Sequence, residues 1–329
     1  MIFINNMCND PYVNHAVEEY FLKYIEEDCF ILWKNRPCIL IGKNQNTLSE
    51  INLQYVDKFN IPVVRRLSGG GAVFNDLGNL NFTFISTKNS KFADFKSFTY
   101  PVIKALKSLG VNAELSGRND LIIDGKKFSG NAQYRYKNKI LHHGTILFDS
   151  NLGNLTGALK VSDIKFKDKG IKSIANRVTN IRKYLKDDMT VEEFKDFLIN
   201  DVMKQFGAKE QYIITKEDKD IIDKISKEKY STWEWNYGNS PKSNFFNEEK
   251  LKCGIVQVTL SIADGSINSI KINGDFFGRE DIGGLENLIV GVKYRKEDIL
   301  EKINAVDISR FITNISLEEF INILFPCEL

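Results

Sequence analysis

The sequence lacks the features that most readily assign a function. Its cysteines are odd in number and widely scattered, and they form no CxxC pair and no cluster with histidine: Cys8, Cys29, Cys38, Cys253 and Cys327. This pattern supports neither a disulfide framework nor a zinc site. An excess of one charge is also missing, because 45 basic and 43 acidic residues give a net charge of +2. Nothing in this balance resembles a nucleic-acid-binding surface.

Long apolar runs are absent as well. The longest, such as CFILW at 29–33, are far too short to span a bilayer, and the amino-terminal stretch carries no basic segment typical of a signal peptide. We therefore expect a cytoplasmic protein with no membrane or nucleic-acid partner. A chain of 329 residues with 43% apolar and 27% charged residues is typical of a soluble globular protein, here with two domains.

The pattern along the chain is mixed. Residues 12–25 predict a helix whose apolar face carries Val13, Ala16, Val17, Tyr20, Phe21, Tyr24 and Ile25. Short apolar runs predict strands at 29–35, 37–42, 61–67, 69–74, 81–86 and 140–149. Helices return at 190–207 and 316–325, each opening with a Ser or Thr followed three residues later by Glu, which is the spacing of a capping box.

A cluster of Gly, Asn, Ser and Pro within residues 233–250 is the best candidate for a linker. Beyond it, residues 253–272 predict a hairpin around an Asp-Gly turn, followed by helices. We therefore predict a domain boundary near residue 245, with one domain over 1–245 and a smaller one over 246–329.

Two arginines directly precede three glycines in the stretch RRLSGGGAVF, residues 65–74. A glycine-rich turn lets backbone N–H groups approach an anion, and arginine adds charge with a geometry suited to phosphate or carboxylate. The spacing is neither GxxxxGK nor GxGxxG, and strand-like residues follow, so the usual nucleotide-binding loops do not explain it. The plain alternative is a β-turn with two solvated arginines.

A second informative stretch is GRNDLIIDGKKFSGNAQ, residues 117–133. A two-residue turn at Asp124-Gly125 would pair Ile123 with Lys126 and Ile122 with Lys127. Because side chains alternate along a strand, the two lysines point to opposite faces, and Lys127 is the one expected to face a cleft. Two exposed turn lysines remain the alternative on this stretch alone.

The third stretch, LHHGTILFD at 141–149, has two adjacent histidines. On a regular strand His142 and His143 point to opposite faces, so they cannot chelate one metal. The one other histidine in the chain is His15. We expect His142 and His143 to be structural or to line a site.

Taken together, in this order and spacing, these motifs closely resemble lipoate–protein ligases of the two-domain type. The stretch KGIKSIANRVTNIRKYL and the INGDFFG segment near the carboxyl end extend the resemblance over essentially the whole chain. One departure is Asn75, where the family often has histidine. The resemblance implies an α+β fold: a lipoyl/biotinyl ligase-type catalytic domain of mixed, largely antiparallel sheets with flanking helices, plus a small α+β accessory domain.

The resemblance also implies a mechanism. ATP activates the lipoate carboxylate as lipoyl-AMP with release of pyrophosphate, and a lysine of the acceptor protein then attacks the mixed anhydride. Two anions meet in the first step, so a cation between them is required. The matching residue is Lys127, as a charge stabiliser. The adenylate pocket would be formed by Arg66, Gly69, Gly70, Gly71, Ala72, Val73 and Phe74, with Asn79, Asn119 and Asp120 as further candidates. Mg²⁺ would accompany ATP, and Asp120 could help to hold it.

The implied partners are lipoyl-domain acceptor proteins, namely the E2 subunits of 2-oxoacid dehydrogenases and the glycine cleavage H protein, and we expect a monomer. Three alternatives remain at this stage. A biotin ligase shares the fold but has a different glycine–arginine motif. An octanoyl or lipoyl transferase would need a cysteine acyl-enzyme, and no cysteine lies between Cys38 and Cys253, where the three stretches at 65–74, 117–133 and 141–149 fall. A non-enzymatic lipoate-binding module would show no turnover.

Overall fold

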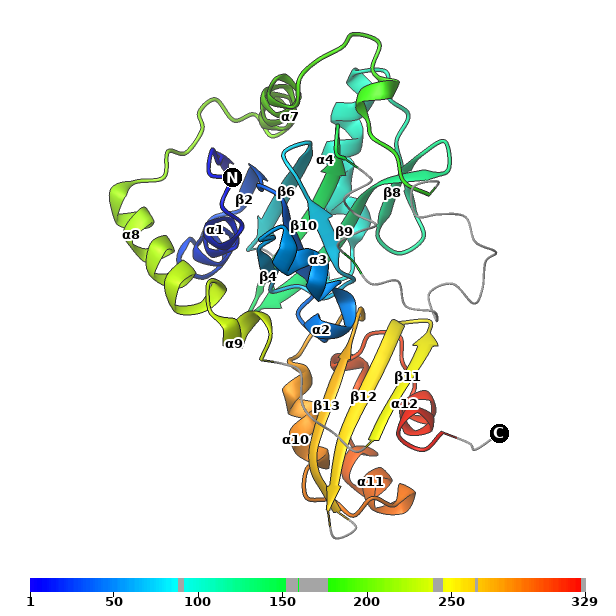
Figure 1. The fold of residues 1–329 in the computed structure, drawn as a ribbon. Coiled ribbons are helices and arrows are strands. Elements are labelled where there is room, and N and C mark those ends of the chain that lie inside the picture. Colours follow the sequence, from blue (N-terminus) through cyan, green and yellow to red (C-terminus); the bar gives the residue numbers. More distant parts are fainter. Residues whose placement is uncertain (88–91, 152–158, 160–176, 239–244, 264–265, 327–329) are drawn as a thin grey trace.

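The computed structural model describes residues 1–87, 92–151, 159, 177–238, 245–263 and 266–326. Figure 1 shows a larger unit formed by the amino-terminal part of the chain and a smaller unit below it, formed by the strands and helices that follow residue 245. The two units have separate hydrophobic cores. None of the helices in these ranges is long and apolar enough to cross a bilayer.

A seven-stranded sheet is the centre of the larger unit. Its strands lie in the order β1 (Ile2–Asn5), β2 (Cys29–Lys34), β6 (Asn79–Ser86), β10 (Lys139–Leu147), β9 (Lys126–Tyr136), β8 (Asp120–Ile123) and β7 (Glu114–Ser116). The pair β1 and β2 is parallel and the other neighbours are antiparallel. The prediction of mixed, largely antiparallel sheets is therefore confirmed.

Both faces of this sheet are covered, which explains the unbroken apolar run of β2. Phe30 and Leu32 pack on one face, in the cluster that includes residues of α4 (Phe95–Ser108) and α7 (Val191–Gln205). Cys29, Ile31 and Trp33 pack on the other face, against α1 (Pro11–Tyr24) and α8 (Lys216–Ile225). Successive side chains of a strand point to opposite faces, so a strand between two apolar layers needs no polar positions.

A small sheet adjoins this second face and carries the glycine stretch. It has the order β4 (Val63–Arg65), β3 (Cys38–Ile41), β5 (Val73–Asn75), with β4 parallel and β5 antiparallel to β3. The short helices α2 (Thr47–Glu50), α3 (Leu53–Lys58) and α9 (Trp233–Asn236) belong to the same region, as does a π-helical turn at Ser226–Tyr230. A 3₁₀ turn at Arg182–Tyr184 packs instead against the core shared by α4 and α7. The glycines thus form the connection between β4 and β5.

The smaller unit is an antiparallel three-stranded sheet packed against helices. The strands are β11 (Phe245–Leu251), β12 (Gly254–Ala263) and β13 (Ser266–Gly274), and the helices are α10 (Ile282–Ile289), α11 (Lys296–Ile303) and α12 (Leu317–Leu324), with a 3₁₀ turn at Ile308–Arg310. The predicted Asp-Gly turn at 264–265 lies outside the described residues. The predicted capping boxes are confirmed at the starts of α7 and α12.

Two local predictions need correction. The helix predicted over 12–25 forms, but Tyr24 on its apolar face is 56% exposed, whereas the polar residues Asn14, His15, Glu18 and Glu19 are buried. This helix lies between the large sheet and α8 and is enclosed on almost every side. The predicted linker is also shorter than 233–250, because residues 233–236 form α9 and β11 begins at residue 245. The boundary at residue 245 itself stays a prediction.

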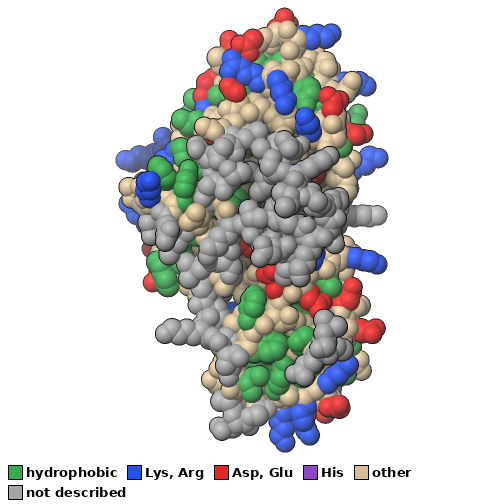
Figure 2. All heavy atoms as spheres, turned by 45° about the vertical axis from the view of Figure 1, so that its right-hand side comes forward, with side chains coloured by type: hydrophobic (Ala, Val, Ile, Leu, Met, Phe, Trp, Pro, Cys, Tyr) green, Lys and Arg blue, Asp and Glu red, His purple; other side chains and the backbone are tan. Residues whose placement is uncertain are grey.

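Charges of both signs are visible on one face of the molecule. On the face shown in Figure 2, Lys and Arg side chains are interspersed with Asp and Glu over both units.

Candidate active site

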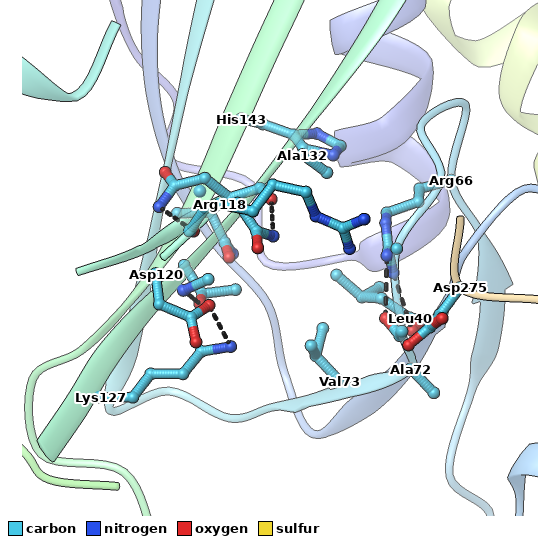
Figure 3. A pocket seen from close by; sticks show the side chains of 18 of the residues that line it. Leu40, Arg66, Ala72, Val73, Arg118, Asp120, Lys127, Ala132, His143 and Asp275 are labelled. Carbon is cyan, nitrogen blue, oxygen red and sulfur yellow. Dashed lines mark hydrogen bonds and ion pairs between the residues drawn. The ribbon is translucent and has the colours of Figure 1, made fainter. Parts of the chain in front are cut away.

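One cavity of about 300 Å³ brings the sequence motifs together. Eight of the residues predicted for the site line it: Arg66, Gly70, Gly71, Ala72, Val73, Asn119, Asp120 and Lys127. Figure 3 shows Lys127 and Asp120 on one side of the cavity and Arg66 and Asp275 on the opposite side. We call the part around Lys127 and Asp120 the mouth, and the part around His15, Trp33 and His143 the inner end.

Three other predicted site residues lie behind the wall of the cavity. Gly69 lies directly against the backbone of Phe276, which belongs to the smaller unit. Phe74 is buried in the core of the small sheet. Asn79 donates from its side-chain amide to Asn81 Oδ1 at 3.0 Å, and Asn81 in turn lines the cavity.

The position that departs from the family, Asn75, lies at the end of β5 and is fully buried. Its Oδ1 accepts hydrogen bonds from the side-chain amides of Asn81, at 2.9 Å, and Asn35, at 3.2 Å. Asn75 does not line the cavity itself. It supports Asn81, which does.

Arg66 organises the glycine stretch through its guanidinium group. Nη2 donates to the carbonyl oxygens of Gly69 and Gly71, at 2.7 and 2.8 Å, and Nη1 donates to that of Leu40, at 3.2 Å. Nε donates to Ser68 Oγ at 3.2 Å. Burial lowers the pKa of Arg66 to about 10, so the group remains a cation at neutral pH. The arginine folds the loop around itself, and Gly70 makes the turn possible with a φ of +90°.

The β8–β9 hairpin positions the mouth as predicted. Ile122 pairs with Lys127 and Ile123 with Lys126, and both turn residues, Asp124 and Gly125, have positive φ, as a type I′ turn requires. Lys126 is exposed, whereas Lys127 lines the cavity. This confirms that the two lysines have different surroundings.

Both the side chain and the backbone of Lys127 are held in place. Its Nζ forms an ion pair with Asp120 Oδ1 at 2.7 Å, across the hairpin. Its carbonyl oxygen accepts a hydrogen bond of 2.8 Å from Thr179 N, next to a parallel bridge between Lys127 and Val178. Part of the stretch KGIKSIANRVTNIRKYL, residues 169–185, therefore lies beside the lysine, while residues 169–176 are outside the described part of the chain. The side chains of Lys127 and Asp120 are 40% and 37% exposed, so this pair is solvated.

Two charged residues at the cavity were not among the predicted site residues. Arg118 donates from Nη1 to the carbonyl oxygen of Cys253 at 2.7 Å, and its guanidinium carbon lies 4.5 Å from the centre of the Phe277 ring. Asp275 comes from the loop after β13 and lines the cavity beside the glycines. Both depend on how the smaller unit docks, which no local pattern of sequence reveals.

The inner end is built around the buried carboxylate of Glu18, which is 3% exposed. Oε2 lies 2.7 Å from His15 Nδ1, and Oε1 lies 2.8 Å from His143 Nδ1. Oε1 also accepts from the Thr83 hydroxyl at 2.7 Å. Burial alone would raise the pKa of Glu18, but electrostatic interaction with His143 and the hydrogen bonds from His143 and His15 outweigh it and hold that pKa far below its usual range.

A hydrogen-bonded chain connects this carboxylate to the glycine stretch. His143 Nε2 lies 2.5 Å from Ser68 Oγ, and Ser68 Oγ accepts from Arg66 Nε. The order is therefore Glu18, His143, Ser68, Arg66, and then the carbonyls of the loop. Sequence reasoning predicted that the two adjacent histidines are structural or line a site, and His143 lines the cavity, whereas His142 stacks on Phe98 in the core. It missed Glu18 and His15, although polar residues within a mostly apolar helix pattern were an available signal.

Two further kinds of chemistry find no support in the described residues. No three His, Cys, Asp or Glu side chains among them come together as a metal cluster. Cys8, Cys29, Cys38 and Cys253 are free thiols, and none lines the cavity. Burial raises the pKa of Cys29 to about 12 and the pKa of Cys253 to about 11, which makes both poor nucleophiles.

Comparison with known proteins now adds to this geometry. Residues 10–203 match the family model of the lipoyl protein ligase A/B catalytic domain, and residues 240–324 match that of the bacterial lipoate protein ligase C-terminus. The lipoate-protein ligase LplJ of Bacillus subtilis is 46% identical over an alignment that covers 99% of this chain and 100% of that protein.

Solved structures have the same architecture. A crystal structure of P. falciparum LipL1 in complex with lipoate superimposes with a TM-score of 0.79 at 26% identity, covering 98% of this chain and 97% of that one. A bi-partite lipoate protein ligase from Thermoplasma acidophilum, studied with its E2 lipoyl domain, superimposes with a TM-score of 0.64 at 28% identity, covering 74% of this chain and 98% of that one.

Proposed function

The chain belongs to the lipoyl protein ligase A/B family, and from this premise we propose that Lys127 stabilises the charge that develops in the first step of its reaction. The activity itself is the ATP-dependent ligation of lipoate to protein. The observation that supports the role of Lys127 is its position: it lines the cavity from the β8–β9 hairpin, while its neighbour Lys126 is exposed.

The first step joins two anions. A carboxylate oxygen of lipoate attacks the α-phosphorus of ATP, the bond from that phosphorus to the pyrophosphate oxygen breaks, and lipoyl-AMP and pyrophosphate form. A fixed ammonium between carboxylate and phosphate offsets their repulsion and stabilises the charge that builds up in the transition state. The ion pair with Asp120 and the hydrogen bond from Thr179 N orient Lys127 before the substrates arrive.

The glycine stretch would receive the adenylate. Its backbone lines the cavity at Gly70 and Gly71, and Arg66 fixes the turn from inside. We assign Arg66 mainly to shaping this loop, because four of its hydrogen bonds go to the loop and its surroundings, and it also brings positive charge to the phosphate side of the cavity.

Mg²⁺ would enter with the phosphates of ATP. It commonly uses one or two carboxylates together with phosphate oxygens and water, and Asp120 is a carboxylate that lines the mouth. Bound there, Mg²⁺ would neutralise phosphate charge. Asp120 would then serve both Lys127 and the metal-bound nucleotide.

In the second step the ε-amine of an acceptor lysine attacks the lipoyl carbonyl carbon, and AMP leaves as the carbon–oxygen bond of the anhydride breaks. We propose lipoyl domains as the acceptors, namely E2 subunits and the glycine cleavage H protein. The archaeal ligase named above was studied with an E2 lipoyl domain, which supports this class of partner. A monomeric, cytoplasmic enzyme stays our expectation.

The smaller unit, proposed as the accessory domain beyond residue 245, would shield the anhydride from water. Gly274 N donates to the carbonyl oxygen of Asn44 at 2.5 Å, and Asp275 reaches the cavity wall. These contacts make the smaller unit part of the site.

The proposal is tested by following the two half-reactions separately. We expect lipoate-dependent exchange of pyrophosphate into ATP without any acceptor protein, and mass spectrometry should find lipoyl-AMP retained by the enzyme. A variant with all five cysteines replaced by serine or alanine should keep both properties. A thioester on a cysteine that passes to an acceptor domain without ATP would refute this mechanism.

A further inference from the structure

A glycine inside strand β9 lies next to the lysine of the mouth. Gly130 lines the cavity, and it is an interior residue of a strand of 11 residues. Its φ lies outside the left-handed region, so the backbone at this position would accept an ordinary side chain. Glycine weakens the interior of a strand, and it often marks a bulge or a place where another group comes close. The backbone conformation of Gly130 therefore does not explain the choice of glycine.

The space that a side chain would need is taken by Lys127. A Cβ added to Gly130 would lie 3.0 Å from Lys127 Nζ and 3.2 Å from Lys127 Cε, which is closer than ordinary van der Waals contact. The side chain of Lys127 therefore lies across Gly130. On strand β8, Gly130 is paired with Asp120, the residue that the ammonium reaches (Figure 3). The bare Cα of Gly130 leaves room for Lys127 on its way to Asp120.

An irregularity in the β8–β9 ladder brings these groups to one face of the hairpin. Lys127 and Gly130 are three positions apart, and in a regular strand such a separation directs side chains to opposite faces. The register between the two strands skips Phe128, which is buried in the core. The extra residue of a bulge reverses the alternation, so Lys127 shares the face of Gly130 and Asp120. The bulge thus aims the lysine, and the glycine makes room for it.

A methyl group at Gly130 would displace the lysine and not the strand. Gly130 N donates to Thr145 Oγ1 at 3.2 Å, and β9 lies between β8 and β10 in the seven-stranded sheet. The backbone of Gly130 is therefore held from both sides. Lys127 has a long, flexible side chain that is 40% exposed, so its ammonium can swing into solvent. Crowding at Gly130 would cost the site its charge before it cost the fold its stability.

We propose that Gly130 is a positioning residue for the formation of lipoyl-AMP, because it keeps the surface of β9 open for the side chain of Lys127. This inference rests on the proposed function, which assigns the ammonium of Lys127 to the first step. Gly130 acts through that ammonium. The bulge at Phe128 sets the direction of the lysine, Gly130 leaves it room, and Asp120 receives its end.

Gly130→Ala tests this in lipoate-dependent exchange of pyrophosphate into ATP. We expect kcat to fall about tenfold, because the ammonium is displaced from its place, while the KM values for lipoate and ATP stay within about twofold. The urea midpoint should not fall, since alanine fits this backbone. Arg135→Ala is the control, an exposed position of the same strand away from the cavity, and it should keep the wild-type kcat. An unchanged kcat in Gly130→Ala would overturn the proposal.

A double substitution decides whether Gly130 acts through the lysine. In a Lys127→Ala background the ammonium is already gone, so adding Gly130→Ala should change the residual rate by less than about twofold. Two residues that act independently would instead multiply their effects. A further tenfold loss in the double variant would mean that the methyl group obstructs the ligand itself, and it would refute the positioning role.

NMR of the wild-type enzyme gives a readout that does not depend on any variant folding. With glycine and lysine isotopically labelled, a nuclear Overhauser effect should connect the α protons of Gly130 with the ε protons of Lys127, because the two groups are in contact. Its absence in the folded protein would overturn the proposal. Wild-type enzyme that shows this contact but no lipoate-dependent exchange would instead count against the proposed function.

Discussion

The two ends of the cavity hold their polar groups in opposite ways. At the mouth, Lys127 and Asp120 form one ion pair whose partners are more than a third exposed. At the inner end, the carboxylate of Glu18 is almost fully buried and receives three donors from three different elements. A solvated pair contributes little to stability and can rearrange around a substrate, whereas a buried carboxylate is stable only if every donor stays in place. The ion pair at the mouth can therefore rearrange during the reaction, whereas the buried carboxylate fixes the shape of the inner end.

Removing the buried carboxylate should have the largest effect on stability. Glu18→Ala would leave His15, His143 and Thr83 without their shared acceptor, and breaking a buried charged cluster by deleting one member typically costs about 3 to 5 kcal/mol. Urea unfolding measures this loss. Glu27→Ala, an exposed glutamate just after α1, is the control and should change stability by less than about 0.5 kcal/mol. Similar losses of stability in the two variants would contradict the idea that the buried carboxylate holds the inner end together.

Changes at the mouth should affect the reaction and leave stability nearly intact. Lys127→Ala should lower the rate of lipoyl-AMP formation on the order of a hundredfold or more, since the loss of a preorganised charge contact has effects of this size. Lys126→Ala, the next residue on the exposed side, should leave the rate almost unchanged. Rapid-quench measurement of lipoyl-AMP compares the two variants. Equal losses of rate would contradict the role of Lys127 as the charge stabiliser.

Between the two ends, the glycine stretch should tolerate a methyl group at one position and not at another. In Gly69→Ala the new Cβ would collide with the carbonyl oxygen of Phe276, so the loop and the smaller unit must move apart. Overpacking of this kind costs about 1 to 3 kcal/mol. In Gly71→Ala the nearest atoms belong to Asp275 at 4.0 Å, and we expect little loss of stability. Urea unfolding of both variants provides the test, and a larger loss in Gly71→Ala would contradict the close contact between Gly69 and Phe276.

The smallest expected effect is a dependence of the free energy of unfolding on pH, caused by buried histidines. Burial lowers the pKa of both His15 and His142, so the folded protein keeps them neutral while the unfolded chain takes up protons below about pH 6.5. Stability is therefore lost as pH falls through this range, with a slope of at most about 1.4 kcal/mol per pH unit for each histidine. The Glu18 contribution belongs to a lower range, below about pH 4.3, because its folded pKa is depressed. The free energy of unfolding as a function of pH checks this: His15→Leu should reduce the slope, and an unchanged slope would argue that His15 is protonated in the fold.

Several local features could be predicted because they depend on near neighbours in the chain. The Asp124-Gly125 turn sets the register that separates Lys126 from Lys127, and the capping boxes at Thr190 and Ser316 start their helices as the spacing indicates. The glycines at 69–71 also connect two strands, as their composition suggests. Turns and caps follow from backbone geometry over a few residues, so sequence alone determines them.

What surrounds those features was decided by tertiary structure. The apolar face predicted for residues 12–25 does not include Glu18. Enclosure of α1 between the sheet and α8 nevertheless buries Glu18 and makes it the centre of the inner end. Arg66 was predicted to meet ligand charge, yet its hydrogen bonds go mainly to the loop that it shapes. The contributions of Arg118 and Asp275 require the smaller unit to dock at the cavity. Burial and long-range contact change what a charged side chain needs, because a charge removed from water must find all of its partners within the fold.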